Sequence, residues 1–343
     1  MRILGIETSC DETAAAVVED GRRVISSVVS SQIELHVPFG GVVPEIAGRA
    51  HVQRMNPVIR QALEQAGSDH RGTGIDAVSC TVGPGLIGAL LIGVSGAKAL
   101  ASAWGVPLLA VNHLEAHLLS PFLEHPDLQL PVVTLLVSGG HTLLVLVESA
   151  TSYRVLGGTI DDAAGEAYDK VARYLGLGYP GGPAIDKLSP QGDPKAIAFP
   201  RAMKNDAYDF SFSGLKTSVV NHIKRNPELQ TADVAASFQE AVVDVLVTKA
   251  KRAALEFNAA GLCIGGGVAA NSLLRARIAE AAAELSIQAY IPPRDMCTDN
   301  AAMVASAAWW RREVDAPASL ALAANPNLRL RTTKSSRQSR SAQ

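Results

Sequence analysis

Residues 2–19 read RILGIETSCDETAAAVVE: an apolar segment, a small polar turn and a second apolar segment. Residues 2–6 and 14–19 have the composition of short strands, and the residues between them favour a turn, so the stretch predicts a β-hairpin. The same order recurs at residues 133–148, VTLLVSGGHTLLVLVE. A strand, turn and strand repeated in this way predicts two homologous halves.

Helical and extended patterns alternate between and after the two hairpins. Strands alternating with helices predict α/β sheets with crossover connections. We expect strands over residues 75–82, 107–111 and 261–264, and helices over 44–66, 86–104, 163–175, 231–257, 272–285 and 301–312, the last returning to the first half.

Length and composition indicate a soluble enzyme of two domains. The chain has 343 residues, of which 48% are hydrophobic and 19% charged, and this length exceeds what one core usually organises. Its longest apolar runs fall far short of the roughly 20 residues that cross a bilayer, and Glu7 interrupts the apolar N-terminus before a signal peptide could form. The four cysteines are widely spaced. We therefore expect a cytoplasmic protein with reduced thiols and no membrane segment.

The overall charge does not indicate a nucleic-acid partner. The formal net charge is −2, and residues 326–343 carry five basic and no acidic side chains, which leaves about −7 (−2 minus 5) elsewhere. We expect this basic tail to be disordered. Binding to RNA would require a local basic patch, although solvated charge is an equal alternative. The candidates are Arg201, Lys204, Lys216, Lys224 and Arg225.

His113 and His117 are the main chemical signal. Side chains four residues apart stack on one face of a helix, where two imidazoles could bind one metal ion. A solvated or buried histidine pair is the alternative. Asp299 could supply a third, oxygen ligand, although it could instead cap the helix expected from residue 301.

A zinc peptidase would place a glutamate directly after the first histidine of such a pair. Leu114 stands there, and Glu115 lies about 200° around the helix, away from the metal face. The spacing therefore argues against proteolysis.

Residues 83–88, GPGLIG, match the dinucleotide fingerprint, but the next strand ends in Asn112 and not in the acid that would bind a ribose. We interpret this segment as a close-packing glycine turn. Residues 138–140, SGG, offer open backbone amides for a phosphate or acyl oxygen, with a plain tight turn as the alternative. Together with the glycine-rich residues 179–186 and 265–271, they favour a nucleotide cleft.

The chain resembles the TsaD family of tRNA threonylcarbamoyladenosine transferases, formerly described as glycoproteases. The resemblance covers roughly residues 1–325, and its motifs occur in one order, which makes it specific. The motifs are ILGIETSCDET (3–13), GGVVPE (40–45), the segment 98–118 that ends in the histidine pair, VSGGHT (137–142), IDDAAGEA (160–167), FSFSGLKT (210–217), GGVAAN (266–271) and CTDN (297–300).

This resemblance implies the two-domain α/β fold of actin-like and sugar-kinase-like (ASKHA) proteins, with a nucleotide in the interdomain cleft. The expected domains are 1–118, to which 301–325 return, and 119–300, followed by the basic tail 326–343.

The resemblance also implies transfer of the threonylcarbamoyl group from threonylcarbamoyl-AMP to the exocyclic amine of adenosine 37 in tRNAs that decode ANN codons, with release of AMP. It implies a divalent metal, iron in preference to zinc, on His113, His117 and Asp299. Asp11 and Glu12 correspond to acids near the reacting centre. Substrate contacts are implied at Leu136, Val137, Ser138, Gly139, Gly140, Asp169, Gly182, Asp186 and Asn271.

Partners implied by the resemblance are tRNA, a paralogous TsaB-like subunit and a small TsaE-like ATPase, and ATP or ADP could occupy the same cleft. One rival is an ATP-hydrolysing or phosphotransferring member of the same fold; the histidine pair argues against it, because phosphoryl transfer there uses carboxylate-held magnesium. A non-catalytic scaffold is the other rival, and the presence of all three candidate ligands argues against it.

Overall fold

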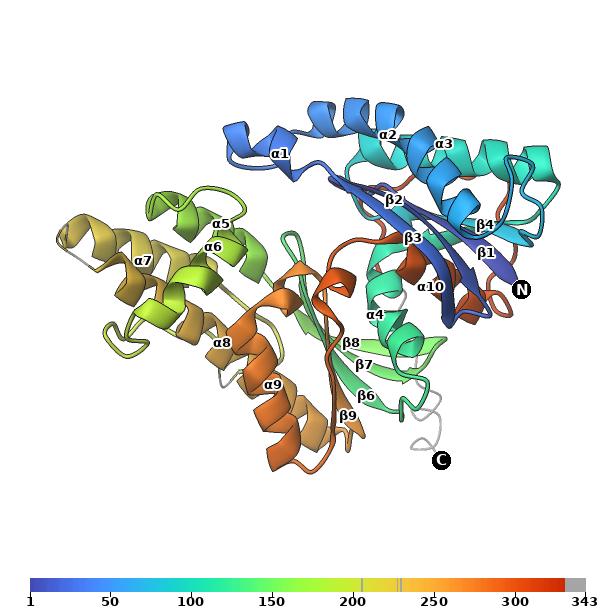
Figure 1. The fold of residues 1–343 in the computed structure, drawn as a ribbon. Coiled ribbons are helices and arrows are strands. Elements are labelled where there is room, and N and C mark those ends of the chain that lie inside the picture. The colour runs from blue at the N-terminus through green and yellow to red at the C-terminus, as the bar shows by residue number, and fades with distance from the viewer. Residues whose placement is uncertain (205, 227, 229, 331–343) are drawn as a thin grey trace.

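The computed structural model describes residues 1–204, 206–226, 228 and 230–330, which form two α/β units (Figure 1). Each unit contains a five-stranded sheet in which an antiparallel meander of three strands is extended by two parallel strands, and the two sheets have the same topology. The predicted repeat of the hairpin is therefore confirmed. The first sheet has the order β3 (Arg23–Ser31), β2 (Glu12–Glu19), β1 (Arg2–Glu7), β4 (Ala77–Gly83), β5 (Leu108–Asn112), and the second the order β10 (Gln288–Tyr290), β9 (Gly261–Gly265), β6 (Val132–Val137), β7 (Thr142–Ser149), β8 (Ser152–Gly158).

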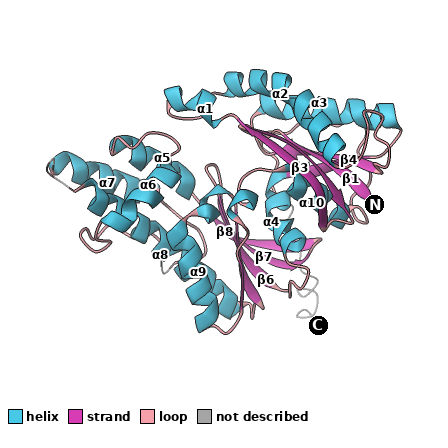
Figure 2. Cartoon of the chain, viewed as in Figure 1, coloured by secondary structure: helices cyan, strands magenta, loops and turns pink. Residues whose placement is uncertain are grey.

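Helices cover both faces of each sheet, and two of them lie between the sheets (Figure 2). α4 (His113–Glu124) and α10 (Ala301–Arg311) share a buried core with residues of both sheets, so α10 packs on the first unit although it comes from the end of the described chain. The outer face of the first sheet carries α2 (Pro44–Gln65) and α3 (Ile87–Trp104), preceded by α1 (Ile33–His36). The outer layer of the second unit contains α5 (Ala164–Tyr174), α6 (Gly181–Leu188), α7 (Ser213–Arg225), α8 (Thr231–Glu256) and α9 (Ser272–Glu284).

By length and composition alone, α3 is the one helix of the described residues that could cross a membrane. Its buried side chains, among them Leu90, Val94 and Ala97, pack against α2 and β4 in the core of the first unit. The expected absence of a membrane segment stays a prediction.

Residues 326–330, at the end of the described chain, contact the first unit: the Pro326 carbonyl accepts from Gly85 N at 3.3 Å, and the Arg329 carbonyl accepts from the Asn112 side chain at 3.1 Å. Two of these five residues are thus held against the first unit by hydrogen bonds, and a disordered tail from residue 326 stays a prediction. Residues 331–343 of that tail lie outside the described residues.

Candidate functional site

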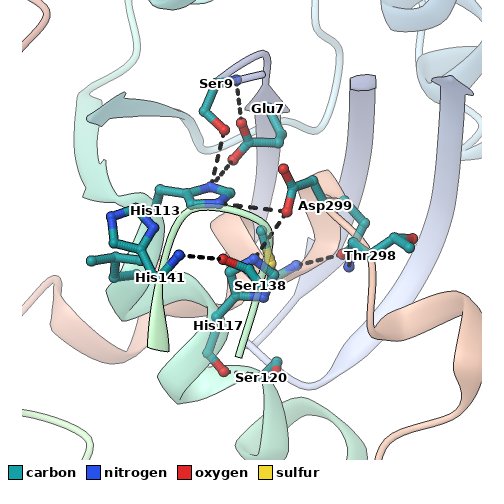
Figure 3. Close-up of polar contacts among 12 residues, drawn as sticks. Glu7, Ser9, His113, His117, Ser120, Ser138, His141, Thr298 and Asp299 are labelled. Carbon is teal, nitrogen blue, oxygen red and sulfur yellow. Dashed lines mark hydrogen bonds and ion pairs between the residues drawn. The ribbon is translucent and has the colours of Figure 1, made fainter. Parts of the chain in front are cut away.

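His113, His117 and Asp299 converge where the two units meet (Figure 3). Asp299 Oδ1 lies 3.0 Å from His117 Nε2 and 3.5 Å from His113 Nε2. One potential ligand atom from each residue lies within 4.8 Å of the others, and both histidines are buried. Two imidazole nitrogens and a carboxylate oxygen are a ligand set that suits zinc, iron and similar divalent ions, so this group could hold a metal ion.

Helix caps determine where α4 and α10 begin and thereby position the candidate ligands. Asn112 accepts from Leu114 N at 2.8 Å, so α4 begins at His113 and carries both histidines on one face. Asn300 accepts from Met303 N at 3.0 Å and thereby caps α10. The alternative in which Asp299 is the helix cap is therefore wrong, and its carboxylate faces the histidines.

Glu7 orients His113 from the end of β1. The fully buried carboxylate lies 3.0 Å from His113 Nδ1 and accepts from Ser9 N at 2.5 Å and from the Thr81 hydroxyl at 2.6 Å. Because Nδ1 is engaged by the protein, Nε2 is left free to face Asp299, where a metal ion could bind. The sequence analysis missed Glu7, whose only signal was a carboxylate at the end of an otherwise apolar strand.

The carboxylates of Asp299 and Glu7 determine the protonation of the candidate metal ligands. Burial opposes protonation of His113, but Asp299 and Glu7 outweigh it and raise its pKa to about 9. Burial alone would raise the pKa of Asp299, yet the two histidines hold it well below its usual range. A cation that replaces the proton on His113 would meet the same attraction.

Asp11 ends the turn of the first hairpin and Glu12 begins β2, close to this group. Burial raises the pKa of Glu12 to about 10, and the charges of Asp299 and Asp11 add to the rise. Without a cation on Asp299, the site favours the protonated form of Glu12, which can donate a hydrogen bond. These effects show that the carboxylates of Glu12, Asp11 and Asp299 lie near one another, whereas a catalytic role for Asp11 and Glu12 stays a prediction.

The second hairpin approaches the same point through residues 138–141. Ser138 N donates to the His141 carbonyl at 2.8 Å, and His141 N donates to Ser138 Oγ at 3.1 Å, which closes the turn. Gly139 and Gly140 are exposed, and a Cβ atom added to either would meet nothing within 4 Å, so a ligand can approach the backbone there. Leu136 and Val137 are fully buried in β6 and can offer a ligand their backbone only.

His141 is a neighbour of the metal group that the sequence analysis did not single out, although it belongs to the quoted turn (Figure 3). Burial lowers its pKa to about 4, and the nearby His113 and His117 contribute to this effect. The imidazole is therefore neutral at physiological pH.

The residues expected to bind the nucleotide meet in the second unit. Asp169 accepts from Gly181 N at 2.8 Å beside Gly182, at the start of α6. Asp186 accepts from Ser272 N at 3.1 Å, next to Asn271. Asn271 caps α9 by accepting from Leu274 N at 2.9 Å. These loops thus lie together, but their polar side chains also hold the protein's own backbone.

Two alternatives from the sequence can now be decided. A Cβ atom on Gly83 would lie 1.9 Å from the Asn325 carbonyl oxygen, and one on Gly85 would lie 2.5 Å from that of Ser9, so these glycines serve close packing. Glu115 contacts the Tyr153 hydroxyl and lies 3.6 Å from Arg311, away from the histidine pair. The peptidase arrangement is therefore absent from α4.

Three of the five candidate RNA-binding cations have acidic partners. Arg201 and Lys204 share Asp244, at 2.9 and 2.8 Å. Lys216 pairs with Asp162 at 2.7 Å. The remaining candidates, Lys224 and Arg225, are exposed in the last turn of α7. A broad basic patch at these five positions is therefore not supported.

Known proteins resemble this chain over nearly its whole length. A family model described as TsaD, tRNA N6-adenosine threonylcarbamoyltransferase, matches residues 23–306. A protein of that same description from Caldicellulosiruptor saccharolyticus is 53% identical, with 91% of this chain and 93% of the relative covered. Another, from Moorella thermoacetica, is 52% identical, with 96% and 97% covered.

Solved structures with the same fold are far less similar in sequence. Full-length HypF in its phosphate- and nucleotide-bound form is 13% identical with a TM-score of 0.61, over 91% of this chain and 46% of HypF. Component A of the (R)-2-hydroxyglutaryl-CoA dehydratase from Acidaminococcus fermentans is 15% identical with a TM-score of 0.56, over 90% and 98%. Identities this low show the fold alone, which is the actin-like two-unit fold.

Proposed function

We propose a residue-level account of catalysis from the premise that this chain belongs to the TsaD family of tRNA N6-adenosine threonylcarbamoyltransferases. The protein transfers a threonylcarbamoyl group to the N6 amine of an adenosine in tRNA. We further propose threonylcarbamoyl-AMP as donor and adenosine 37 of tRNAs that read ANN codons as acceptor. The convergence of His113, His117 and Asp299 is the observation that carries the account.

The three converging residues would hold one divalent metal ion, iron in preference to zinc. Such an ion supplies Lewis-acid polarisation and orientation of substrate oxygens. Glu7 keeps the His113 ring in the orientation in which Nε2 faces the ion. Because both imidazoles are buried and hydrogen-bonded or packed, the chain pre-arranges these ligands.

The donor's AMP would lie on Gly182, Asp186, Asn271 and the glycine turns, with its acyl end toward Ser138–Gly140. The exposed, uncrowded backbone of Gly139 and Gly140 supports this placement, because its amides could stabilise the negative charge that develops on the carbamoyl oxygen. Asp169, whose pKa burial raises, lies on α5 and accepts from Gly181 N beside Gly182. ATP or ADP could bind in the same cleft.

In the transfer, the N6 nitrogen attacks the carbamoyl carbon. A C–N bond forms, the bond from that carbon to the phosphate oxygen breaks, AMP leaves, and the amine loses one proton. Asp11 is the proposed group that orients the amine and accepts this proton. Burial favours the protonated form of Glu12, which would let it donate a hydrogen bond to the substrate, whereas a cation on Asp299 would offset that carboxylate's contribution to the raised pKa.

Protein partners are a further part of the proposal: a TsaB-like paralogue and a TsaE-like ATPase, in the cytoplasm. Support comes from exposed apolar side chains on α2 and α3, where Val52, Ile87 and Leu91 are 60%, 48% and 49% exposed. Gly48 and Gly88 bring these helices close together. An aliphatic surface across two packed helices suits a protein partner.

The decisive experiment mixes metal-loaded protein and its partner subunits with threonylcarbamoyl-AMP and unmodified tRNA. Nucleoside mass spectrometry should detect threonylcarbamoyladenosine with the wild-type chain and not with His113→Ala, His117→Ala or Asp299→Asn. The same variants should lose stoichiometric metal by elemental analysis. The ligand assignment fails if they keep both metal and activity, and the phosphotransferase rival gains if ATP is consumed and no modified nucleoside forms.

A further inference from the structure

Phe39 and Tyr174 are the two aromatic side chains that stand clearly exposed within the described residues. They are 59% and 56% exposed, whereas the other described aromatic side chains are buried or half-buried. Large exposed aromatic rings are costly in water and commonly mark a binding surface. Their location therefore matters.

The two rings flank the same contact between the units. Phe39 ends the 3₁₀ turn Val37–Phe39 of the first unit, and Tyr174 ends α5 of the second. Between them, Arg173 Nη2 donates to the Gly40 carbonyl at 2.5 Å, across 133 residues of chain. Gly40 adopts a left-handed conformation with φ of 66°, which directs its carbonyl without the strain that a side chain would add.

Phe39, Arg173 and Tyr174 form a rim that adjoins the proposed substrate site. Asp169 lies one helical turn before Arg173 on α5. Burial raises the pKa of Asp169. The charge of Arg173 lowers it and the charge of Asp11 raises it further, so Asp169 lies near both Arg173 and the proposed reacting centre. The exposed rings thus lie at the edge of the site that must receive the acceptor adenosine.

We propose that Phe39 and Tyr174 form a stacking platform for unpaired bases of the tRNA loop that presents the acceptor adenosine, with the exposed Arg173 beside their phosphates. Proteins read single-stranded RNA by stacking splayed bases on aromatic rings and arginine. An enzyme that reacts with an exocyclic amine also needs the neighbouring bases held while the target leaves the stack. This inference rests on the proposed function, because it assumes a tRNA acceptor.

A protein partner is the competing occupant, since Leu35 and Val37 beside Phe39 are also exposed, at 40% and 47%. The geometry favours RNA, because each unit contributes one exposed aromatic residue directly beside the Arg173–Gly40 contact that joins them. Aliphatic and aromatic replacements separate the two possibilities: stacking needs a flat ring, whereas docking of a protein tolerates leucine.

The test uses the full chain with its partner subunits and an unmodified anticodon stem-loop. Phe39→Ala and Tyr174→Ala should each weaken RNA binding about ten-fold and raise the KM for tRNA, with the KM for the donor unchanged. Phe39→Tyr should retain binding, and Phe39→Leu should resemble Phe39→Ala. Leu255→Ala, which removes another apolar side chain that is 60% exposed on α8, should match wild type.

The platform is wrong if Phe39→Leu binds RNA like wild type, or if Phe39→Ala loses a partner subunit in co-purification with unchanged RNA affinity. Failure of the proposed function itself would differ, because the wild-type chain would then form no threonylcarbamoyladenosine at saturating tRNA and donor.

Discussion

Asp299 and His117 are 182 residues apart in the chain, yet Oδ1 of the carboxylate lies 3.0 Å from Nε2 of the imidazole. The contact joins the segment before α10 to α4, and these two helices pack against each other between the two sheets. The geometry of the ligand group therefore depends on helix packing as well as on the ligands themselves. Substitutions that leave all three ligands in place can still change metal affinity.

Glu7→Gln should weaken metal binding in this indirect way. The amide keeps the size of the carboxylate but removes the negative charge beside His113 Nδ1, 3.0 Å away. We expect an affinity loss of about 10- to 100-fold, the usual effect of removing such a supporting carboxylate. Competition with a chromogenic chelator measures it. Glu19→Gln, at the other end of the same hairpin, is the control, and equal affinities in both folded variants would contradict the role.

Metal binding should release a proton at neutral pH. In the metal-free protein, burial opposes protonation of His113 but Asp299 and Glu7 raise its pKa from 6.5 to about 9. The protonated ring stabilises the metal-free fold fully below pH 6.5, and this contribution is lost as pH rises through about 9. A bound metal must displace that proton.

We therefore expect about one proton released per ion at neutral pH, and close to none above about pH 10. Calorimetric titration in buffers of different ionisation enthalpy measures the number. His113→Gln should release less at neutral pH. A release that stays constant from neutral to strongly alkaline pH would exclude His113 as the source.

Both hairpins could be predicted because strand, turn and strand follow one another locally. The third strand of each meander could not be predicted, because β3 and β8 lie at sheet edges and bury few of their side chains. The short parallel edge strand β10 was also missed, because it has only three residues. Edge strands bury fewer side chains, so their apolar pattern is weak. The return of residues 326–330 to the first unit depends on contacts far along the chain, and no local signal marks them.

In the candidate site, too, features with a local sequence signal could be predicted and those that depend on distant residues could not. The spacing of His113 and His117 indicated a shared face of one helix, because that geometry is local. Glu7 was missed because its role depends on a partner 106 residues away. Asp186 and Asn271 came from the family resemblance, and the structure shows that each also holds the start of α9.

Gly85→Ala should destabilise the fold, whereas Gly88→Ala in the same motif should not. A Cβ atom at Gly85 would lie 2.5 Å from the Ser9 carbonyl oxygen, but one at Gly88 would meet nothing within 4 Å. We expect a loss of more than about 1 kcal/mol in the free energy of unfolding for Gly85→Ala, and a neutral or stabilising effect for Gly88→Ala. Urea unfolding measures both. Equal effects would contradict the close-packing interpretation.

Glu115→Ala should destabilise the protein while leaving the metal site filled. The Glu115 side chain is buried on the face of α4 opposite the histidines, where it contacts the Tyr153 hydroxyl and the half-buried Arg311 guanidinium. Removing one partner of a buried ion pair leaves the other charge poorly compensated, at a cost of about 3 kcal/mol. Arg311 retains Asp315, at 2.7 Å, which limits the loss.

Asp315→Ala is the matched control, because it removes the more exposed acid of the same arginine and should cost about 1 kcal/mol or less. Urea unfolding compares the two variants, and elemental analysis should give equal metal content in both. A peptidase would need Glu115 beside the metal-bound water, so Glu115→Ala would then abolish catalysis with little loss of stability. The position of Glu115 against Arg311 leads us to expect the reverse: reduced stability and retained threonylcarbamoyl transfer by the folded fraction.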